Sequence, residues 1–264
     1  IEPQDGKNII DYLNQNIGNE NTKFHAGVSY RNLMVTSPAE QFADLTATPP
    51  HDIIGQKIDN YLPKGNGAQR IKNIMDSASK ALADCEINKK RVQEGKSPAN
   101  SIWLWGQGQM PTLEPFKETY GLSIAVITAV DLVKGLGKLL GGKTIEVEGA
   151  TGYVDTNYAG KAQAACDALD NVDMVVIHVE APDEAGHSGD PQIKKQALEL
   201  IDSEIIGPVH EKLSSFDDYR IMVLPDHPTP VSVRSHTSDP VPFVIEGSNV
   251  SQKPARSFDE NNAK

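Results

Sequence analysis

The 264-residue chain is long enough for one large domain or two ordinary ones, each with a real apolar core. Its 36 acidic and 25 basic residues give a net charge of −11, which would repel a phosphate backbone and excludes nucleic acid as an expected partner. No apolar run could cross a bilayer, and Cys85 and Cys166 are far apart and suit reduced thiols, so we expect a cytoplasmic protein with no membrane partner.

The first part of the chain mixes short helical and strand patterns with loops rich in Pro and Gly. An amphipathic pattern predicts a helix over residues 8–17, and β-rich runs predict strands within residues 24–36. Irregular loops at 47–52 and 61–67 are followed by a predicted helix from Ala68 to about Asp84. Pro111 and Pro115 then interrupt the pattern, so we divide the chain into domains 1–113 and 114–264.

Strands and helices alternate beyond this boundary. The patterns predict strands at 122–128, 144–147, 172–179, 220–224 and 241–245, and helices at 131–140, 157–168 and 191–213. Elements of these lengths imply right-handed crossovers and a sheet covered by helices on both faces. We therefore predict an α/β fold with a mostly parallel sheet for residues 114–264.

Two of the predicted strands end in clusters of aspartate and histidine. The run at 172–179 is followed by Asp183 and His187, and the run at 220–224 by Asp226 and His227. Apolar runs bounded by Pro and Gly are typical of buried parallel strands, and open α/β sheets bind ligands beyond the carboxyl ends of such strands. The clusters therefore predict a site at this edge of the sheet.

The spacing within the clusters favours a metal site. Asp183 and His187 are four residues apart, so a helical turn that opens at Asp183 would direct both side chains to one ion. Asp226 and His227 can share an ion only if the strand has already ended, which Pro228 favours. One oxygen and one nitrogen donor suit Zn²⁺ or Mn²⁺ better than Ca²⁺.

Each of these residues alone also has an ordinary structural explanation. An aspartate that follows a strand, such as Asp183, commonly caps the next helix. A single histidine is commonly a surface residue or a hydrogen-bonded core residue, and we expect the latter for His178, which lies inside a predicted strand. The metal hypothesis therefore depends on the set and not on any one member.

The number of candidate ligands leaves two alternatives open. Asp183, His187 and the later His236 make three, the usual protein complement of a catalytic site, whereas Asp226 and His227 make only two. Either there is one irregular centre, or further ligands lie outside this sequence. The chain begins at Ile1 without a methionine, so we expect it to start inside a larger protein.

Three motifs resemble those of a known enzyme family. The segments Asp183-Glu-Ala-Gly-His187, Asp226-His227-Pro-Thr-Pro and His236-Thr-Ser-Asp-Pro-Val-Pro-Phe243 resemble the metal-binding motifs of cofactor-independent phosphoglycerate mutases of the alkaline phosphatase superfamily. The closer resemblance is to the archaeal-type branch, which includes proposed homoserine kinases. Further likeness covers residues 30–33, 48–52, 100–105 and 145–152.

This resemblance implies a fold and a set of ligands. It implies a three-layer alkaline-phosphatase-like core, with an inserted α+β substrate-binding domain in residues 1–113, each only partly present. It also implies two divalent ions, Mn or Zn with Mg as a third choice, one held by Asp183, His187 and His236 and the other by Asp226 and His227.

The sequence departs from the family pattern in one informative way. Family members open with a strand that ends in an Asp-Gly motif, whose aspartate binds the second metal, followed by a serine that takes the phosphoryl group. Neither is present here, so we expect a fragment without the catalytic nucleophile. Hydroxyl side chains beside the predicted ligands are expected to hydrogen-bond near them and not to replace that serine; they are Ser188, Thr229, Ser235 and Thr237.

The resemblance also implies an activity. The intact protein would interconvert 3-phosphoglycerate and 2-phosphoglycerate, a step of glycolysis and gluconeogenesis, through a phosphoserine, with a small phosphorylated molecule as its partner. One alternative is a homoserine kinase or another metal-dependent phosphotransferase or phosphatase. Another is an isolated fragment without activity.

Such a substrate requires cations for its phosphate and carboxylate oxygens. Arg31 and Lys134 are the predicted substrate-binding residues, although a helical Lys134 could also face solvent, and a strand-borne Arg31 could be purely structural. The run Lys89, Lys90 and Arg91 is a further candidate, for which a solvated charge run is the alternative explanation.

Overall fold

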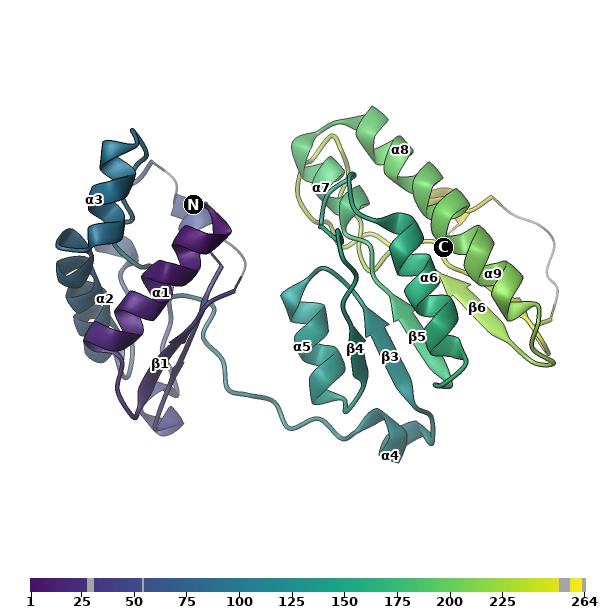
Figure 1. Ribbon diagram of the computed structural model, residues 1–264, viewed down its shortest axis with the longest axis horizontal. Helices are drawn as coiled ribbons and strands as arrows, with labels where there is room; N and C mark the ends of the chain where they lie inside the picture. Colours follow the sequence, from purple (N-terminus) through teal and green to yellow (C-terminus); the bar gives the residue numbers. More distant parts are fainter. Residues whose placement is uncertain (28–30, 54, 252–256, 263–264) are drawn as a thin grey trace. The chain divides into compact units, whose positions relative to one another are not determined.

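A computed structural model describes the chain except residues 28–30, 54, 252–256 and 263–264 (Figure 1). The chain forms two compact units, Ile1–Pro111 and Thr112–Lys264, each of which is considered by itself. The assignment of substrate binding to the first part and metal binding to the second remains a prediction.

The first unit packs helices against a small hairpin. Its elements are α1 (Pro3–Ile17), β1 (Thr22–His25), β2 (Leu33–Thr36), α2 (Ala68–Ala83) and α3 (Glu86–Gln93), with short 3₁₀ turns at Ala39–Phe42, Pro50–Ile53 and Ile58–Tyr61. Strands β1 and β2 are antiparallel. Leu13 of α1, Phe24 of β1 and Leu82 of α2 are buried in one shared core.

Two details of this unit correct the sequence predictions. Arg31 lies in the connection between β1 and β2 and not on a strand. The charged segment that contains Lys89 forms helix α3, because Asn88 and Arg91 supply a buried face that a search for apolar residues does not detect.

The second unit follows the predicted alternation of strands and helices. Its elements are α4 (Phe116–Tyr120), β3 (Ile124–Ile127), α5 (Asp131–Leu139), β4 (Lys143–Ile145), α6 (Tyr158–Leu169), β5 (Met174–Ile177), α7 (Ala181–Ser188), α8 (Pro191–Ile201), α9 (Gly207–Leu213), β6 (Arg220–Val223) and β7 (Val244–Gly247). No described helix is both long enough and apolar enough to traverse a membrane.

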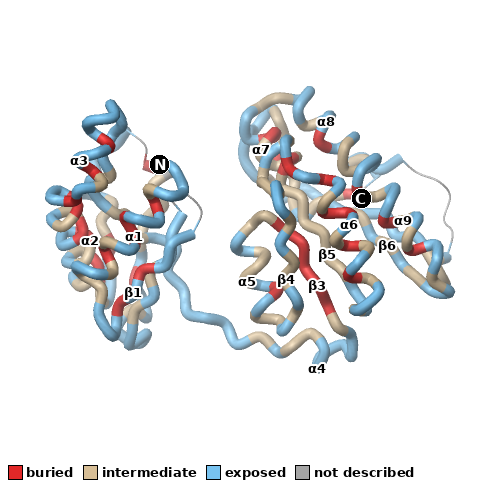
Figure 2. Tube along the Cα trace, in the orientation of Figure 1, coloured by how far each residue is buried: buried red, intermediate tan, exposed pale blue. Residues whose placement is uncertain are grey.

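A parallel sheet with strand order β4-β3-β5 lies at the centre of this unit. All four residues of β3 are buried (Figure 2). Neighbouring residues on a strand face opposite sides: Val126 lies next to Gly137 of α5, whereas Ile127 belongs to the same core cluster as Ala162 of α6. Helices therefore cover both faces of this sheet, and the predicted α/β class is confirmed.

Strands β6 and β7 differ from the prediction. They form a separate antiparallel pair, with Met222 opposite Ile245, so residues 220–224 are not a buried parallel strand. Ile221 packs against the core, while the side chain of Met222 is 54% exposed. The alternation of buried and exposed side chains could not be recognised in the sequence, because nearly every residue of the run is apolar.

The predicted helix 191–213 is continuous but contains a π turn at Asp202–Ile206 between α8 and α9. Pro208 follows after Gly207 and has no backbone N–H, so the regular bond to the carbonyl four residues earlier cannot form there. A widened turn accommodates this interruption without ending the helix.

Candidate metal centre

Helix α7 carries the first pair of predicted ligands. Pro182 lies in its first turn, and Gly189, with φ of 76°, ends it in the left-handed conformation. Asp183 and His187 lie one turn apart, with His187 Nε2 3.2 Å from Asp183 Oδ2. The N-cap position is Glu180, so capping does not explain Asp183.

The connection between β6 and β7 brings two other predicted ligands, His227 and His236, to α7. His236 Nε2 lies 3.3 Å from Asp183 Oδ1 and 3.1 Å from His187 Nε2. The His227 ring lies 4.0 Å from the His236 ring, between centroids. Donor atoms of Asp183, His227 and His236 all lie within 4.8 Å of one another.

Asp226 lies at the margin of this cluster. Its Oδ1 accepts a hydrogen bond of 3.0 Å from the backbone N–H of His227, and its side chain is 71% exposed. Its Oδ2 lies 3.7 Å from His227 Nε2, so the two adjacent ligands stay together. Asp183, His187 and His236 form one group of close contacts, and His227 lies beside Asp183 and His236.

Gly186 allows the two halves of the cluster to approach. A Cβ atom at this position would lie 2.4 Å from the carbonyl oxygen of Thr229, well inside van der Waals contact. Only glycine permits this approach between α7 and the loop after β6. We did not single out Gly186 from the sequence, although its position between Asp183 and His187 was an available signal.

Thr229 links the loop to the helix. This residue is buried, its hydroxyl donates to Asp183 Oδ1, and the same hydroxyl oxygen lies 3.4 Å from His227 Nδ1. The expectation that Thr229 hydrogen-bonds the ligands is confirmed. Ser188 instead donates to the carbonyl of Ala185, and the buried hydroxyl of Thr237 has no hydrogen-bond partner among the described residues.

The hydrogen bonds fix which nitrogen of each ring faces the centre. His187 Nδ1 lies 3.1 Å from the carbonyl oxygen of Arg234, which can only accept, so Nδ1 carries the proton. The Thr229 hydroxyl gives its proton to Asp183 and can only accept from His227 Nδ1. In both rings Nε2 is left with its lone pair available, as in metal-binding histidines.

This donor set fits a cation. A carboxylate and two imidazole Nε2 atoms lie 3.1 to 3.3 Å apart, so their lone pairs face one another unless a proton or a metal ion lies between them. One oxygen donor and two or three nitrogen donors suit Zn²⁺ or Mn²⁺.

His178 directly follows β5, and Lys161 of α6 bonds its backbone carbonyl. His178 Nδ1 is 3.1 Å from Thr128 Oγ1, and burial lowers the pKa of this histidine, which keeps the ring neutral at pH 7. The expected hydrogen-bonded histidine is therefore found, partly buried. Lys161 is fully buried, donates to the His178 carbonyl at 3.4 Å, and has its pKa lowered by desolvation.

The predicted cations have other partners. Lys134 Nζ lies 3.6 Å from Glu146 Oε1, and Arg31 belongs to the first unit. Lys89 and Lys90 pair with glutamates of their own segment, as a solvated charge run would. Arg91 departs from that explanation because it is buried and pairs with Asp5.

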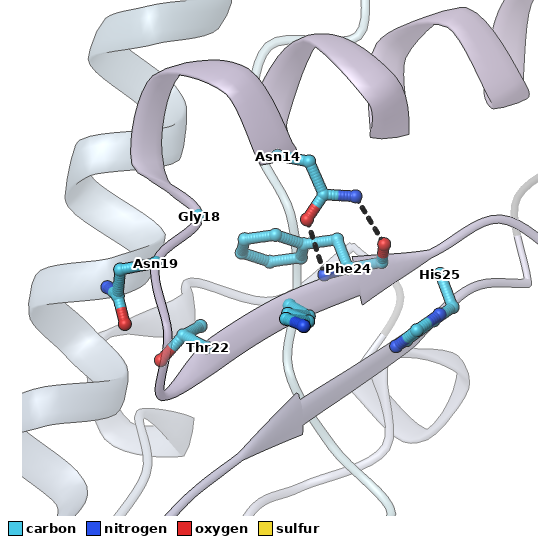
Figure 3. Close-up of a pocket in the computed structure, with 7 residues that line it drawn as sticks. Asn14, Gly18, Asn19, Thr22, Phe24 and His25 are labelled. Carbon is cyan, nitrogen blue, oxygen red and sulfur yellow. Dashed lines mark hydrogen bonds between the residues drawn. The ribbon is translucent and has the colours of Figure 1, made fainter.

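A shallow hollow of about 440 Å³ in the first unit lies along β1 (Figure 3). The Asn14 side-chain amide bonds both the N–H and the carbonyl of Phe24, so it occupies the hydrogen-bonding edge of the strand. The polar side chains that line the hollow are those of asparagine, threonine, lysine and histidine, and none of the lining residues has a carboxylate. We assign no chemistry to it.

Comparison with known proteins gives a consistent set of relatives. Residues 20–263 match the family model described as the metalloenzyme superfamily. The whole chain is 47% identical to 66% of the 2,3-bisphosphoglycerate-independent phosphoglycerate mutase of Methanothrix thermoacetophila. It is 46% identical to 67% of the protein of that name from Methanosarcina mazei. The chain thus spans about two thirds of the length of the curated relatives that it matches.

Solved structures show the same likeness. The PH0037 protein from Pyrococcus horikoshii is 26% identical, with a TM-score of 0.74 over 94% of this chain and 60% of that chain. The cofactor-independent phosphoglycerate mutase from Thermoplasma acidophilum is 22% identical, with a TM-score of 0.55 over 83% of this chain and 56% of that chain. The second likeness concerns the fold alone.

Proposed function

The chain belongs to the metalloenzyme superfamily, among the archaeal-type 2,3-bisphosphoglycerate-independent phosphoglycerate mutases, and from this membership we propose that it is the metal-binding part of an enzyme that interconverts 3-phosphoglycerate and 2-phosphoglycerate. The observation that carries the proposal is the convergence of Asp183, His187 and His236 within 3.1 to 3.3 Å. Such a donor set is what phosphoryl transfer with a metal requires.

Membership of this superfamily implies the use of a divalent metal. We propose that Asp183, His187 and His236 hold one ion, and that His227 and Asp226 contribute to a second. Mn²⁺ or Zn²⁺ suits these donors best, with Mg²⁺ as a third choice. When bound, such ions activate the attacking oxygen and neutralise charge on the transferred phosphoryl group.

The surrounding residues hold these ligands ready. Thr229 fixes the Asp183 carboxylate, and the Arg234 carbonyl fixes the tautomer of His187. His236 and Asp226 are 54% and 71% exposed, so a small anion can reach the centre from solvent. We propose no nucleophile among these residues.

The proposed substrate is a small phosphorylated acid, which needs cations on a chain of net charge −11. Arg31 and Lys134 remain the proposed substrate-binding residues. Lys134 can exchange its pairing with the exposed Glu146, whose side chain is 84% exposed, for a substrate anion. We propose a cytoplasmic location for this chemistry.

Activity assays separate the mutase from its main alternative. The full-length protein, and not this chain alone, should convert 3-phosphoglycerate in the presence of Mn²⁺ or Zn²⁺ and lose this activity in a chelator. Asp183→Asn should abolish both activity and tight metal binding. Turnover with homoserine and ATP, but not with 3-phosphoglycerate, would instead identify a kinase and overturn the proposal.

A further inference from the structure

Lys194 of α8 directs its ammonium group toward the loop after β6, which contains His227 and Thr229. Its Nζ donates a hydrogen bond of 2.7 Å to the carbonyl oxygen of Thr229, 35 residues away. Burial lowers the pKa of this lysine, while the charge of Asp183 acts in the opposite direction. Partly removing an ammonium group from water costs free energy. This cost is unusual for a contact that only holds a loop in place.

The carbonyl that Lys194 holds is the one that touches α7. The Thr229 oxygen is close enough to Gly186 that a Cβ atom there would lie at 2.4 Å. Lys194 therefore retains this carbonyl against α7 from the α8 side. The Thr229 side chain then donates to Asp183 Oδ1.

We propose that Lys194 is a positioning residue for the metal ligands. By fixing the Thr229 backbone, it holds the Thr229 hydroxyl on Asp183 and keeps the loop of Asp226 and His227 beside α7. Lys194 acts through Thr229 and does not coordinate the ion. The inference rests on the proposed metal centre but not on the identity of the substrate.

The neighbouring Lys195 provides a matched control. It lies on the same helix, its side chain is 65% exposed, and it pairs with Glu199 one turn later. Lys194→Met and Lys195→Met remove the same charge and the same donor group from adjacent positions. Only the first loses a contact with Thr229.

Titration of the metal-free protein with Co²⁺ tests the inference without an activity assay. The visible absorption of bound Co²⁺ reports the geometry of its ligands. We expect Lys194→Met to weaken Co²⁺ binding about 10-fold or more and to alter the absorption bands, as loss of a supporting hydrogen bond near a metal usually does. Lys195→Met should match the wild type, and Lys194→Arg should recover part of the affinity.

A double-mutant cycle tests whether the effect passes through Thr229. Thr229→Val removes the hydroxyl, and adding Lys194→Met to it should cost much less affinity than Lys194→Met costs alone. Additive losses would overturn the relay. If Lys194→Met does not fold, the same cycle with the shorter, uncharged Lys194→Gln decides the question.

The outcomes distinguish this inference from the proposed function. Wild-type affinity and an unchanged Co²⁺ spectrum in Lys194→Met would overturn the positioning inference alone. A wild-type protein that binds no Co²⁺, Mn²⁺ or Zn²⁺ would overturn the metal centre and this inference with it.

Discussion

Gly186 has a defined steric function at the centre. The hydrogen atom in place of a side chain lets the Thr229 carbonyl approach α7, which brings His227 beside Asp183. A methyl group there meets backbone and not the end of a flexible side chain, so it cannot be accommodated by a rotamer change.

We therefore predict that Gly186→Ala separates the loop from the helix. The free energy of unfolding should fall by about 1 to 3 kcal/mol, as in other overpacked sites, and Zn²⁺ affinity should fall by about 10-fold or more. Urea unfolding and calorimetric titration measure the two effects.

Gly135 of α5 is the control for this substitution. Beyond its own helix backbone, no atom of the described residues lies within 4 Å of the position that its Cβ would take, and its own backbone is helical. Gly135→Ala should stabilise the protein by about 0.5 to 1 kcal/mol through helix propensity. Equal metal affinity in Gly186→Ala and the wild type would contradict the steric argument.

At this scale the sequence predicted which side chains come together, while their binding of a metal remains a prediction. Asp183, His187 and His236 are in close contact, His227 lies beside them, and the exposed Asp226 stays 3.7 Å from His227 Nε2. Gly186 and Lys194 could not be identified by composition, because their importance depends on which backbone atom the fold places next to them.

Single polar side chains also connect the secondary-structure elements. Asn14 of α1 bonds both backbone groups of Phe24 in β1 and so joins helix to strand (Figure 3). Because the Phe24 ring is in the core, movement of this strand would disturb more than one contact.

We expect Asn14→Ala to destabilise the chain by about 1 to 3 kcal/mol, since it leaves backbone groups without partners. Asn16→Ala is the matched control on the same helix, because Asn16 makes one exposed bond of 2.8 Å to the Tyr12 carbonyl; its effect should stay within about 0.5 kcal/mol. Urea midpoints compare the variants, and equal midpoints would contradict the bridging function.

Asp173 connects the starts of β3 and β5. Its carboxylate accepts bonds from the side chain and backbone of Ser123, and these bonds hold the pKa of Asp173 below its usual range. A lowered folded-state pKa means that the stabilisation is present above the unfolded pKa, near 3.9, and is lost as the pH falls through the folded value.

Asp173→Ala should therefore destabilise the protein at pH 7 and progressively less below about pH 4. Denaturant midpoints at a series of pH values measure this dependence. The exposed Glu211→Ala in α9 is the control and should not change the midpoint at pH 7. A penalty for Asp173→Ala that did not shrink in acid would show that the charge is unimportant.

Local patterns predicted the existence of most elements, with the ends displaced by a few residues. They failed for α3, whose buried face is polar, and for the direction and exposure of β6, whose apolar residues occupy both faces. A strand's pairing partner is a long-range property that the four residues of β6 do not contain.

The second unit exposes apolar side chains on and beside the β6–β7 pair. Met222 and Leu224 are 54% and 51% exposed, and Phe243 and Ile245 are 65% and 37% exposed. Met222 and Ile245 are directly opposite in this ladder, so their side chains lie on one face, and Leu224 and Phe243 adjoin the ends of the same two strands. Contiguous exposed apolar surface promotes association.

We predict that the 264-residue chain associates as its concentration rises and that Met222→Lys reduces this association. Light scattering over a concentration series measures it. Leu132→Lys is the control, because Leu132 of α5 is 72% exposed but lies on another element. An equal effect of the two substitutions would implicate net charge and not this face.

The broad class and the family were accessible from the sequence because they depend on motifs at strand ends and on the alternation of elements. The assignment of substrate binding to the first unit and metal binding to the second remains a prediction, because neither motifs nor periodicity describe it.

The π turn before Pro208 has a consequence for register around the helix axis. Core side chains Ala197, Ile205, Val209 and Leu213 recur in multiples of four, whereas an α-helix turns once in about 3.6 residues. Over the sixteen steps from Ala197 to Leu213, the direction of these side chains would rotate by about 160° around the axis of a regular α-helix. The one extra residue in the wider π turn offsets about 100° of this rotation. The number of residues between α8 and α9, more than their chemical nature, is therefore what keeps α9 facing inward.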